Sequence, residues 1–185
     1  CARDFTAQAK RRKAAIDKYL WLKPQGRYVD WDRTTRAATP VVSAATLYPL
    51  FVGLAAPAQA KAVATTTRAT LLGQGGLRTT TLRTGQQWDD PNGWAPLQWI
   101  AVDGLARYGE DALARDIARR WIATVTRSYR ETGKMLEKYD VAEQTAGGGG
   151  EYPTQDGFGW TNGVTGALIA RYPDLVAAPP PAAED

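Results

Sequence analysis

Residues 137–163 read EKYDVAEQTAGGGGEYPTQDGFGWTNG, and this stretch determines how the rest of the chain is interpreted. At its centre are four consecutive glycines, residues 147–150. Glycine loses more backbone freedom on folding than other residues and has no side chain to pack, so such a run is typical of a sharp turn or of backbone close to a ligand. Carboxylates and aromatic rings flank the run (Glu137, Asp140, Glu143, Glu151, Asp156, Tyr139, Tyr152, Phe158, Trp160). A flexible Gly-rich linker is the simpler alternative, but the aromatic residues that follow favour a binding loop.

A second cluster of aromatic and acidic residues lies upstream, where residues 86–98 read QQWDDPNGWAPLQ. Together with EKYD at residues 137–140 and the motif of residues 147–164, it resembles the two long signatures of the trehalase family, in the family's order. A weaker similarity at residues 20–30 extends the match over most of the chain. The resemblance implies the (α/α)6 barrel of the trehalases and the hydrolysis of α,α-trehalose to two glucose molecules with inversion of configuration. It also implies a periplasmic or secreted location, and neither a cofactor nor a metal.

The resemblance assigns roles to three residues. It implies that Glu137 is the general base, that Glu151 binds sugar hydroxyls, and that Trp88 forms a wall beside a glucose ring. The residues alone leave other interpretations open. A salt bridge from Glu137 to Lys138 or Lys134 is the better interpretation from spacing, and the family motif is what favours catalysis. Trp88 fits a buried core position on a packed loop equally well.

The family pattern is incomplete in this chain. The signature nearer the N-terminus, the general-acid aspartate and the sugar-gripping arginines of the trehalases have no counterpart in residues 1–185. We therefore expect residues 1–176 to be the C-terminal portion of a trehalase-like catalytic domain, with the remaining N-terminal part of the barrel as its partner. The alternative is a catalytically inactive carbohydrate-binding or interaction module derived from that fold, and the missing acid is its main support.

The composition excludes several other kinds of site. The chain has no histidine and one cysteine, which excludes a Ser-His-Asp triad, a Cys-His pair and an internal disulfide within these residues. No apolar run is long enough to span a bilayer, so no membrane partner is expected. The net charge of +4 is mild, and the basic residues 10–13 have no aromatic residues among them. We expect them to form a solvated helix face and not a nucleic-acid site.

Apolar residues recur at helical spacing in six segments, which predicts helices over residues 2–20, 39–55, 57–72, 94–108, 110–129 and 161–172. Thr161 is expected to cap the last helix, and Glu137 to end a helical run. Residues 73–93 show no periodicity and are expected to form a functional loop, and residues 177–185 a flexible Pro/Ala-rich tail. The aromatic and acidic residues of 20–32 either line a sugar site or, as we favour for most of them, pack the helix end. The prediction is all-α, with about six helices, no strand and the long loops at one end, forming part of the (α/α)6 barrel.

Overall fold

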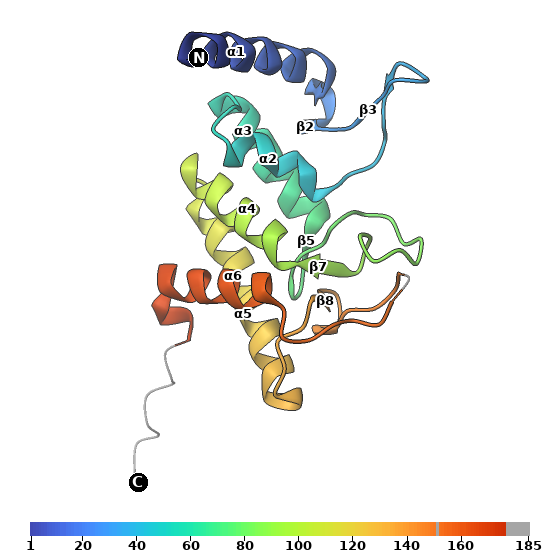
Figure 1. Ribbon diagram of the computed structural model, residues 1–185, viewed down its shortest axis with the longest axis vertical. Coiled ribbons are helices and arrows are strands. Elements are labelled where there is room, and N and C mark those ends of the chain that lie inside the picture. Colours follow the sequence, from blue (N-terminus) through green and yellow to red (C-terminus); the bar gives the residue numbers. More distant parts are fainter. Residues whose placement is uncertain (151, 177–185) are drawn as a thin grey trace.

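The computed structural model describes residues 1–150 and 152–176, and within these residues it contains six α-helices. They are α1 (Ala2–Tyr19), α2 (Tyr48–Phe51), α3 (Pro57–Thr66), α4 (Ala95–Arg107), α5 (Asp111–Thr132) and α6 (Gly159–Arg171). Helix α4 is central, because α2, α5 and α6 all pack against it (Figure 1). The prediction of a mainly helical chain with about six helices is confirmed for the described residues.

Helix α5 shows why the periodic segments fold as expected. Its buried apolar side chains follow helical spacing and face α4 and α6 (Leu113, Ala114, Ile117, Ala118, Trp121, Ile122, Val125). The helix ends at Gly133, whose φ of 69° is the left-handed conformation that glycine adopts without strain. The burial of this stripe makes the pair α4–α5 the core of the molecule.

A close helix contact depends on Gly104 in α4. A Cβ atom at this position would lie 2.8 Å from the backbone nitrogen of Phe51 in α2. The absence of a side chain therefore lets the two helices approach at backbone distance, and Leu50 fills the space beside them as a fully buried residue.

Nine short strands are present within the described part of the chain, so the prediction of no strand is wrong. Each is two or three residues long: β1 (Trp21–Leu22), β2 (Arg27–Tyr28), β3 (Trp31–Asp32), β4 (Ala37–Ala38), β5 (Leu72–Gly73), β6 (Gly76–Leu77), β7 (Asn92–Trp94), β8 (Lys138–Asp140) and β9 (Thr145–Ala146). They form three antiparallel pairs, β1–β2, β3–β4 and β5–β6, and one antiparallel sheet of order β7-β8-β9. Strands this short carry no alternating pattern that a sequence window can detect.

The expected helix over residues 39–55 is also wrong. Only the 3-10 turn η2 (Ala44–Leu47) and the single turn of α2 are helical there. The preceding backbone pairs with another segment: the Ala44 amide donates to the Thr79 carbonyl at 2.8 Å, and the Thr81 amide donates to the Val42 carbonyl at 3.1 Å. These long-range hydrogen bonds replace the local ones that a helix would need.

Two other expected elements differ in detail. The third helix continues beyond α3 as a π-helical turn, η3 (Thr67–Leu71). Helix α6 begins at Gly159 with Phe158 as its cap residue, so Thr161 lies inside the helix and does not cap it. After α6, a short 3-10 turn, η4 (Pro173–Leu175), ends the described chain, and the expected tail of residues 177–185 lies outside the described residues.

Helix α1 lies at one end of the molecule (Figure 1) and contributes no residue of the buried class. Its apolar residue Phe5 is 68% exposed. The basic residues 10–13 are exposed as predicted. The apolar positions of α1 are thus largely without a covering layer in this chain.

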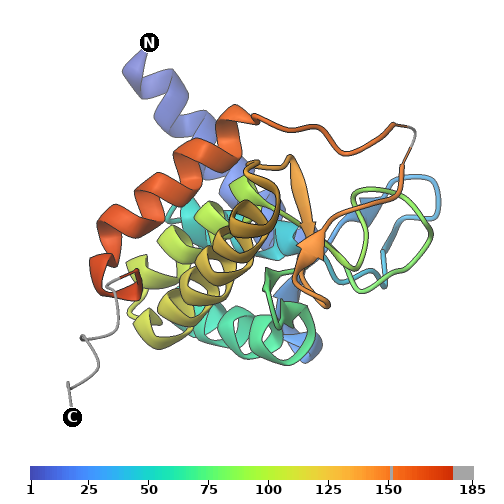
Figure 2. The ribbon, with the colours of Figure 1, turned by 90° about the horizontal axis from the view of Figure 1, so that it is seen from below.

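The loops and short strands gather on one side of the helices, as expected, and both views show this (Figures 1 and 2). Strands β7 and β8 lie at the boundary between this loop layer and the helical core (Figure 1). Throughout residues 1–150 and 152–176, no helix combines the length and the apolarity needed to cross a membrane.

Candidate active site

The two sequence motifs meet in one antiparallel ladder. Strand β7, from the motif of residues 86–98, pairs with β8, from the EKYD motif, in the register Asn92↔Asp140, Gly93↔Tyr139 and Trp94↔Lys138. A Cβ atom at Gly93 would lie 2.4 Å from a methyl group of Val141, so only glycine fits this position. The ladder brings residues that are more than forty positions apart in the sequence to the same edge of the loop layer.

The backbone around Glu137 is fixed by the segment that enters α6. The Glu137 amide donates to the Gln155 carbonyl at 2.8 Å, and the indole nitrogen of Trp160 donates to the Glu137 carbonyl at 3.2 Å. Thr161 donates its hydroxyl to the Leu136 carbonyl at 2.7 Å. Helix α5 has already ended at Thr132, so Glu137 lies immediately before β8 and not at the end of a helical run.

The Glu137 side chain is buried, with the residue 3% exposed, and both of its oxygens accept hydrogen bonds. Lys138 Nζ lies 3.0 Å from Oε2, and the Tyr152 hydroxyl donates to Oε1 at 2.9 Å. The hydrogen bond to this carboxylate raises the pKa of Tyr152 above its ordinary value of 10.0. The salt bridge to Lys138 that spacing suggested is therefore present, whereas Lys134 pairs with Asp156 at 2.6 Å.

Trp88 lies beside this carboxylate network as part of an aromatic cluster. Its ring stacks on Trp94 with the centroids 3.9 Å apart and the planes 3° from parallel. The edge of Trp160 meets the stack, at 5.6 Å from the Trp94 centroid and 6.4 Å from that of Trp88. Trp94 is 1% exposed but Trp88 is 44% exposed, so Trp88 is not a core residue. One face of Trp88 is covered by Trp94, which leaves the other as an aromatic surface at the edge of the cluster.

The glycine run is attached to the same layer. Asn92 donates its side-chain nitrogen to the Gly148 carbonyl at 2.7 Å, and the Gly150 amide donates to the Gly85 carbonyl at 3.1 Å. Gly150 has a φ of 82°, and a Cβ atom there would lie 2.9 Å from the side chain of Gln87 in the neighbouring loop. The run therefore allows two loops to lie at backbone contact, as a glycine-rich turn requires. Glu151 lies outside the described residues.

The neighbouring aspartates are engaged in structural contacts. Asp89 accepts hydrogen bonds from Thr80 and Thr84. Asp90 forms salt bridges with two arginines, and Asp140 Oδ1 accepts from two backbone amides that follow it, which fixes the turn after β8. Each of these carboxylates thus has partners that account for its position without a catalytic role.

The aromatic residues of 20–32 pack at the end of α1, as favoured. Trp21 lies against Tyr28 with ring centroids 4.8 Å apart, and Tyr19 lies against Trp31 at 5.5 Å. Asp32 accepts from the amides of the two residues that close the following turn. These residues stabilise the β1–β2 and β3–β4 hairpins, and they lie at the opposite end of the loop layer from β8 (Figure 1).

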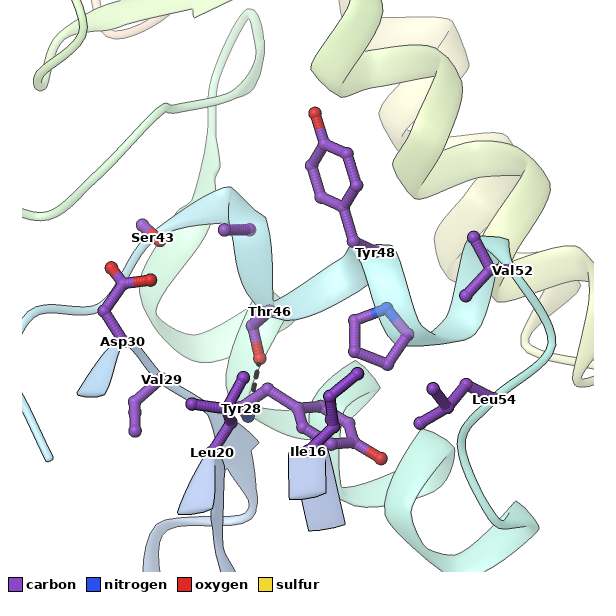
Figure 3. A pocket seen from close by; sticks show the side chains of 12 residues that line it. Ile16, Leu20, Tyr28, Val29, Asp30, Ser43, Thr46, Tyr48, Val52 and Leu54 are labelled. Atoms are coloured by element: carbon purple, nitrogen blue, oxygen red, sulfur yellow. Dashed lines mark hydrogen bonds between the residues drawn. The ribbon is translucent and has the colours of Figure 1, made fainter. Parts of the chain in front are cut away.

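A cavity of about 220 Å³ lies among α1, β2, η2 and α2 (Figure 3). Its walls are mainly apolar, with Asp30 at one side and Thr46 accepting a hydrogen bond from the Tyr28 amide at 3.0 Å. Within the described residues the Tyr28 hydroxyl is buried and has no hydrogen-bond partner. Tyr28 and Asp30 line this cavity, whereas Glu137 and Trp88 do not.

Sequence reasoning missed the contacts that join the two motifs. Lys138 is fully buried, and its Nζ donates to Gln87 Oε1 at 3.3 Å and lies 5.4 Å from the Trp94 ring centroid. Tyr152 holds the second oxygen of Glu137, whereas the sequence indicates only a ring beside the glycines. No local signal identifies such partners, because Gln87 and Lys138 are 51 positions apart.

Comparison with known proteins identifies the family of this chain. Residues 1–173 match the family model described as Trehalase. Over 182 residues the chain is 57% identical to a periplasmic trehalase of Xanthomonas axonopodis pv. citri, an alignment that covers 97% of this chain and 32% of the relative. A periplasmic trehalase of Pseudomonas aeruginosa is 53% identical over 173 residues, and the alignment covers 93% of this chain and 32% of the relative. The chain spans about a third of the length of these curated relatives.

Solved structures give the fold. The neutral trehalase of Saccharomyces cerevisiae is similar with a TM-score of 0.76 and 32% identity, over 89% of this chain and 30% of that one. A GH63 mannosylglycerate hydrolase from Thermus thermophilus has a TM-score of 0.70 at 22% identity, and the match covers 86% of this chain and 38% of the hydrolase. This likeness concerns the fold alone. Both neighbours are (α/α)6-barrel proteins, so the chain has part of that fold, as predicted.

Proposed function

Because this chain belongs to the trehalase family, we propose that it is the C-terminal portion of a trehalase and supplies the general base for hydrolysing α,α-trehalose to two glucose molecules. The observation that carries the proposal is the β7–β8 ladder, which joins the two signature motifs around one buried carboxylate. The relatives are named periplasmic trehalases, and we propose the same location for the protein that contains this chain.

In the proposed reaction, Glu137 accepts a proton from a water molecule whose oxygen attacks the anomeric carbon. The glycosidic C–O bond breaks as a carboxylic acid on the other side of the sugar protonates the leaving oxygen. An inverting enzyme places its two carboxyl groups about 6.5–9.5 Å apart to leave room for the water. Carboxylates alone perform this chemistry, so the proposal includes no cofactor.

We assign the general acid to the part of the barrel outside this chain. The engagement of Asp89, Asp90 and Asp140 in structural contacts supports this assignment. Their partners are threonine hydroxyls, arginines and turn amides of the same loop layer, so these contacts explain where the three carboxylates lie without a contact to the glycosidic oxygen. The remaining barrel is thus the partner that this proposal requires.

Trp88 is proposed to offer its free ring face to the C–H face of a glucose unit, and its 44% exposure supports this role. Glu151 is proposed to accept hydrogen bonds from sugar hydroxyls, on the family resemblance of the motif that contains it. Both would act in binding and would not exchange protons with the substrate.

The test is a chimera in which this chain replaces the matching segment of the Xanthomonas axonopodis trehalase. Trehalose and the chimera are mixed, and proton NMR follows the anomers of glucose before they equilibrate. Inversion converts the attacked unit to β-glucose while the leaving unit stays α, so the first products should be equal amounts of the two. Release of α-glucose alone would contradict inversion.

In the same chimera, Glu137→Gln should lower kcat by about 10²–10⁴-fold, since a general base typically contributes that factor. Near-normal turnover would remove Glu137 from the mechanism. The 185-residue chain alone should release no glucose, because the leaving oxygen has no acid. Trehalose binding by the chain together with an inactive chimera would favour the carbohydrate-binding module instead.

A further inference from the structure

Lys138 is a charged side chain with no solvent exposure at all. Removing an ammonium group from water costs several kcal/mol unless partners compensate, and a buried ion pair often adds little net stability. Here the partners are Glu137 Oε2 at 3.0 Å and Gln87 Oε1 at 3.3 Å. Two rings also surround the ammonium, Trp94 at 5.4 Å and Tyr152 at 5.1 Å from their centroids. Stability is a weak explanation for so complete an enclosure, and orientation of the carboxylate is a better one.

The two oxygens of Glu137 have different surroundings. Oε2 faces the fully buried ammonium of Lys138. Oε1 faces the hydroxyl of Tyr152, a residue that is 39% exposed. A carboxylate oxygen has two lone pairs, so Oε1 can accept from Tyr152 and from a water at the same time. Of the two partners, the one at Oε1 is therefore the more exposed to solvent.

We propose that Lys138 is a positioning residue that fixes the Glu137 carboxylate through Oε2, so that Oε1 is the oxygen that takes the proton of the attacking water. This inference rests on the proposed function, because it concerns how the proposed base is held. In the reaction the O–H bond of water breaks, its proton goes to Oε1 and its oxygen bonds to the anomeric carbon. The leaving oxygen receives its proton from the carboxylic acid outside this chain.

The position of Lys138 makes it suited to this task. It lies in β8 directly opposite Trp94 of β7, so its backbone is held by the ladder. Its ammonium group donates to the side-chain Oε1 of Gln87, and the backbone carbonyl of Gln87 accepts from the Trp94 indole at 3.1 Å. The lysine therefore connects the proposed base with Trp94, on which Trp88, the proposed sugar wall, is stacked.

The variants are made in the chimera, and kcat and KM for trehalose are measured from glucose release. Lys138→Met should lower kcat by about 100-fold, the cost of a small misplacement of a catalytic group, with KM changed by less than about threefold. Lys138→Arg, which keeps the charge, should recover at least about tenfold of that loss. Lys134→Met is the matched control, since this exposed lysine also pairs with a carboxylate on the same segment, and it should stay within about twofold of the parent.

The double variant separates positioning from other roles. If Lys138 acts through Glu137, then Lys138→Met in the Glu137→Gln background should cause no further loss of kcat beyond about threefold. This comparison also holds if Lys138→Met alone fails to fold, because the double variant leaves no unpaired buried charge. A further loss of about 100-fold in that background, or a Lys138→Met variant as active as the Lys134→Met control, would overturn the inference.

The two proposals fail in different ways. Normal turnover of Glu137→Gln would end the assignment of the base and, with it, the role of Lys138. An inactive Glu137→Gln beside a fully active Lys138→Met would leave the base in place and end only the positioning role.

Discussion

Gln98→Leu should destabilise this chain more than a single polar substitution usually does. The Gln98 side chain is fully buried in α4, and its Oε1 accepts from the Leu77 amide at 2.7 Å while its Nε2 donates to the Leu77 carbonyl at 2.8 Å. Leucine removes both hydrogen bonds and leaves two buried backbone groups of β6 without them. At about 1–3 kcal/mol for each unsatisfied group, the free energy of unfolding should fall by about 2–6 kcal/mol.

The measurement is urea unfolding of the 185-residue chain, followed by far-UV circular dichroism. The midpoint should fall while the m-value stays the same, because the surface exposed on unfolding is unchanged. Gln8→Leu on the exposed helix α1 is the control, and it should change the free energy of unfolding by less than about 0.5 kcal/mol. A loss for Gln98→Leu below about 1 kcal/mol would refute the claim that this amide supplies the missing backbone partner of β6.

Gly104→Ala should destabilise the chain by about 1–3 kcal/mol in the same assay, because its Cβ would lie 2.8 Å from the backbone of α2. Gly166→Ala, with open space around its Cβ, should stabilise α6 by about 0.5–1 kcal/mol, and equal effects would contradict the close contact. Burial raises the pKa of Tyr28 above its ordinary value of 10.0, so folding favours the protonated phenol, and this stability is present below pH 10 and is lost as the pH rises further. Tyr28→Phe should therefore be neutral or stabilising at neutral pH and should reduce the alkaline loss of stability, which unfolding at several pH values would show; an unchanged alkaline profile would count against it. In the chimera, Trp88→Ala should raise KM for trehalose by about tenfold, because one aromatic contact with the sugar is lost. An unchanged KM would contradict the proposed role of Trp88 in binding a glucose ring.

The long helices of the core could be predicted from the sequence. In α4 and α5 the apolar residues recur at helical spacing over thirteen and 22 residues, and glycines mark where each helix stops. Here local preference and tertiary packing agree, so a sequence window contains the needed information.

The short elements could not be predicted, because their hydrogen bonds are long-range. The apolar pattern of residues 39–55 fits a helix, yet the backbone of residues 42–44 pairs with residues 79–81. Strands of two residues are formed by their partners and not by their own propensity. The position of Glu137 was missed for the same reason, since its backbone is held by the Gln155 carbonyl and the Trp160 indole.

The candidate site was found only in part. Glu137 and Trp88 were identified through the family motifs, and the structure brings them into one layer. The buried Lys138, its contact with Gln87 and the Tyr152 hydroxyl emerged only from the structure. The sequence Glu137-Lys138 does not reveal whether the pair is exposed or buried, because the burial of Lys138 depends on β7 and on the glycine run, which lie elsewhere in the sequence.

Among the described residues, Lys138 and Tyr152 contact the Glu137 carboxylate, and under the proposed function this has a consequence for how a complete barrel would work. Lys138 and Tyr152 contact the two oxygens, and Gln155 and the Trp160 indole hold the Glu137 backbone. The proposed base is therefore held within the loop layer by contacts from this chain. The distance to an acid on another segment then depends on how the rest of the barrel docks on this layer, and inversion requires that this distance admit a water. In this division, docking of the barrel controls the gap, while the local network of Lys138 and Tyr152 controls the direction in which Glu137 faces it.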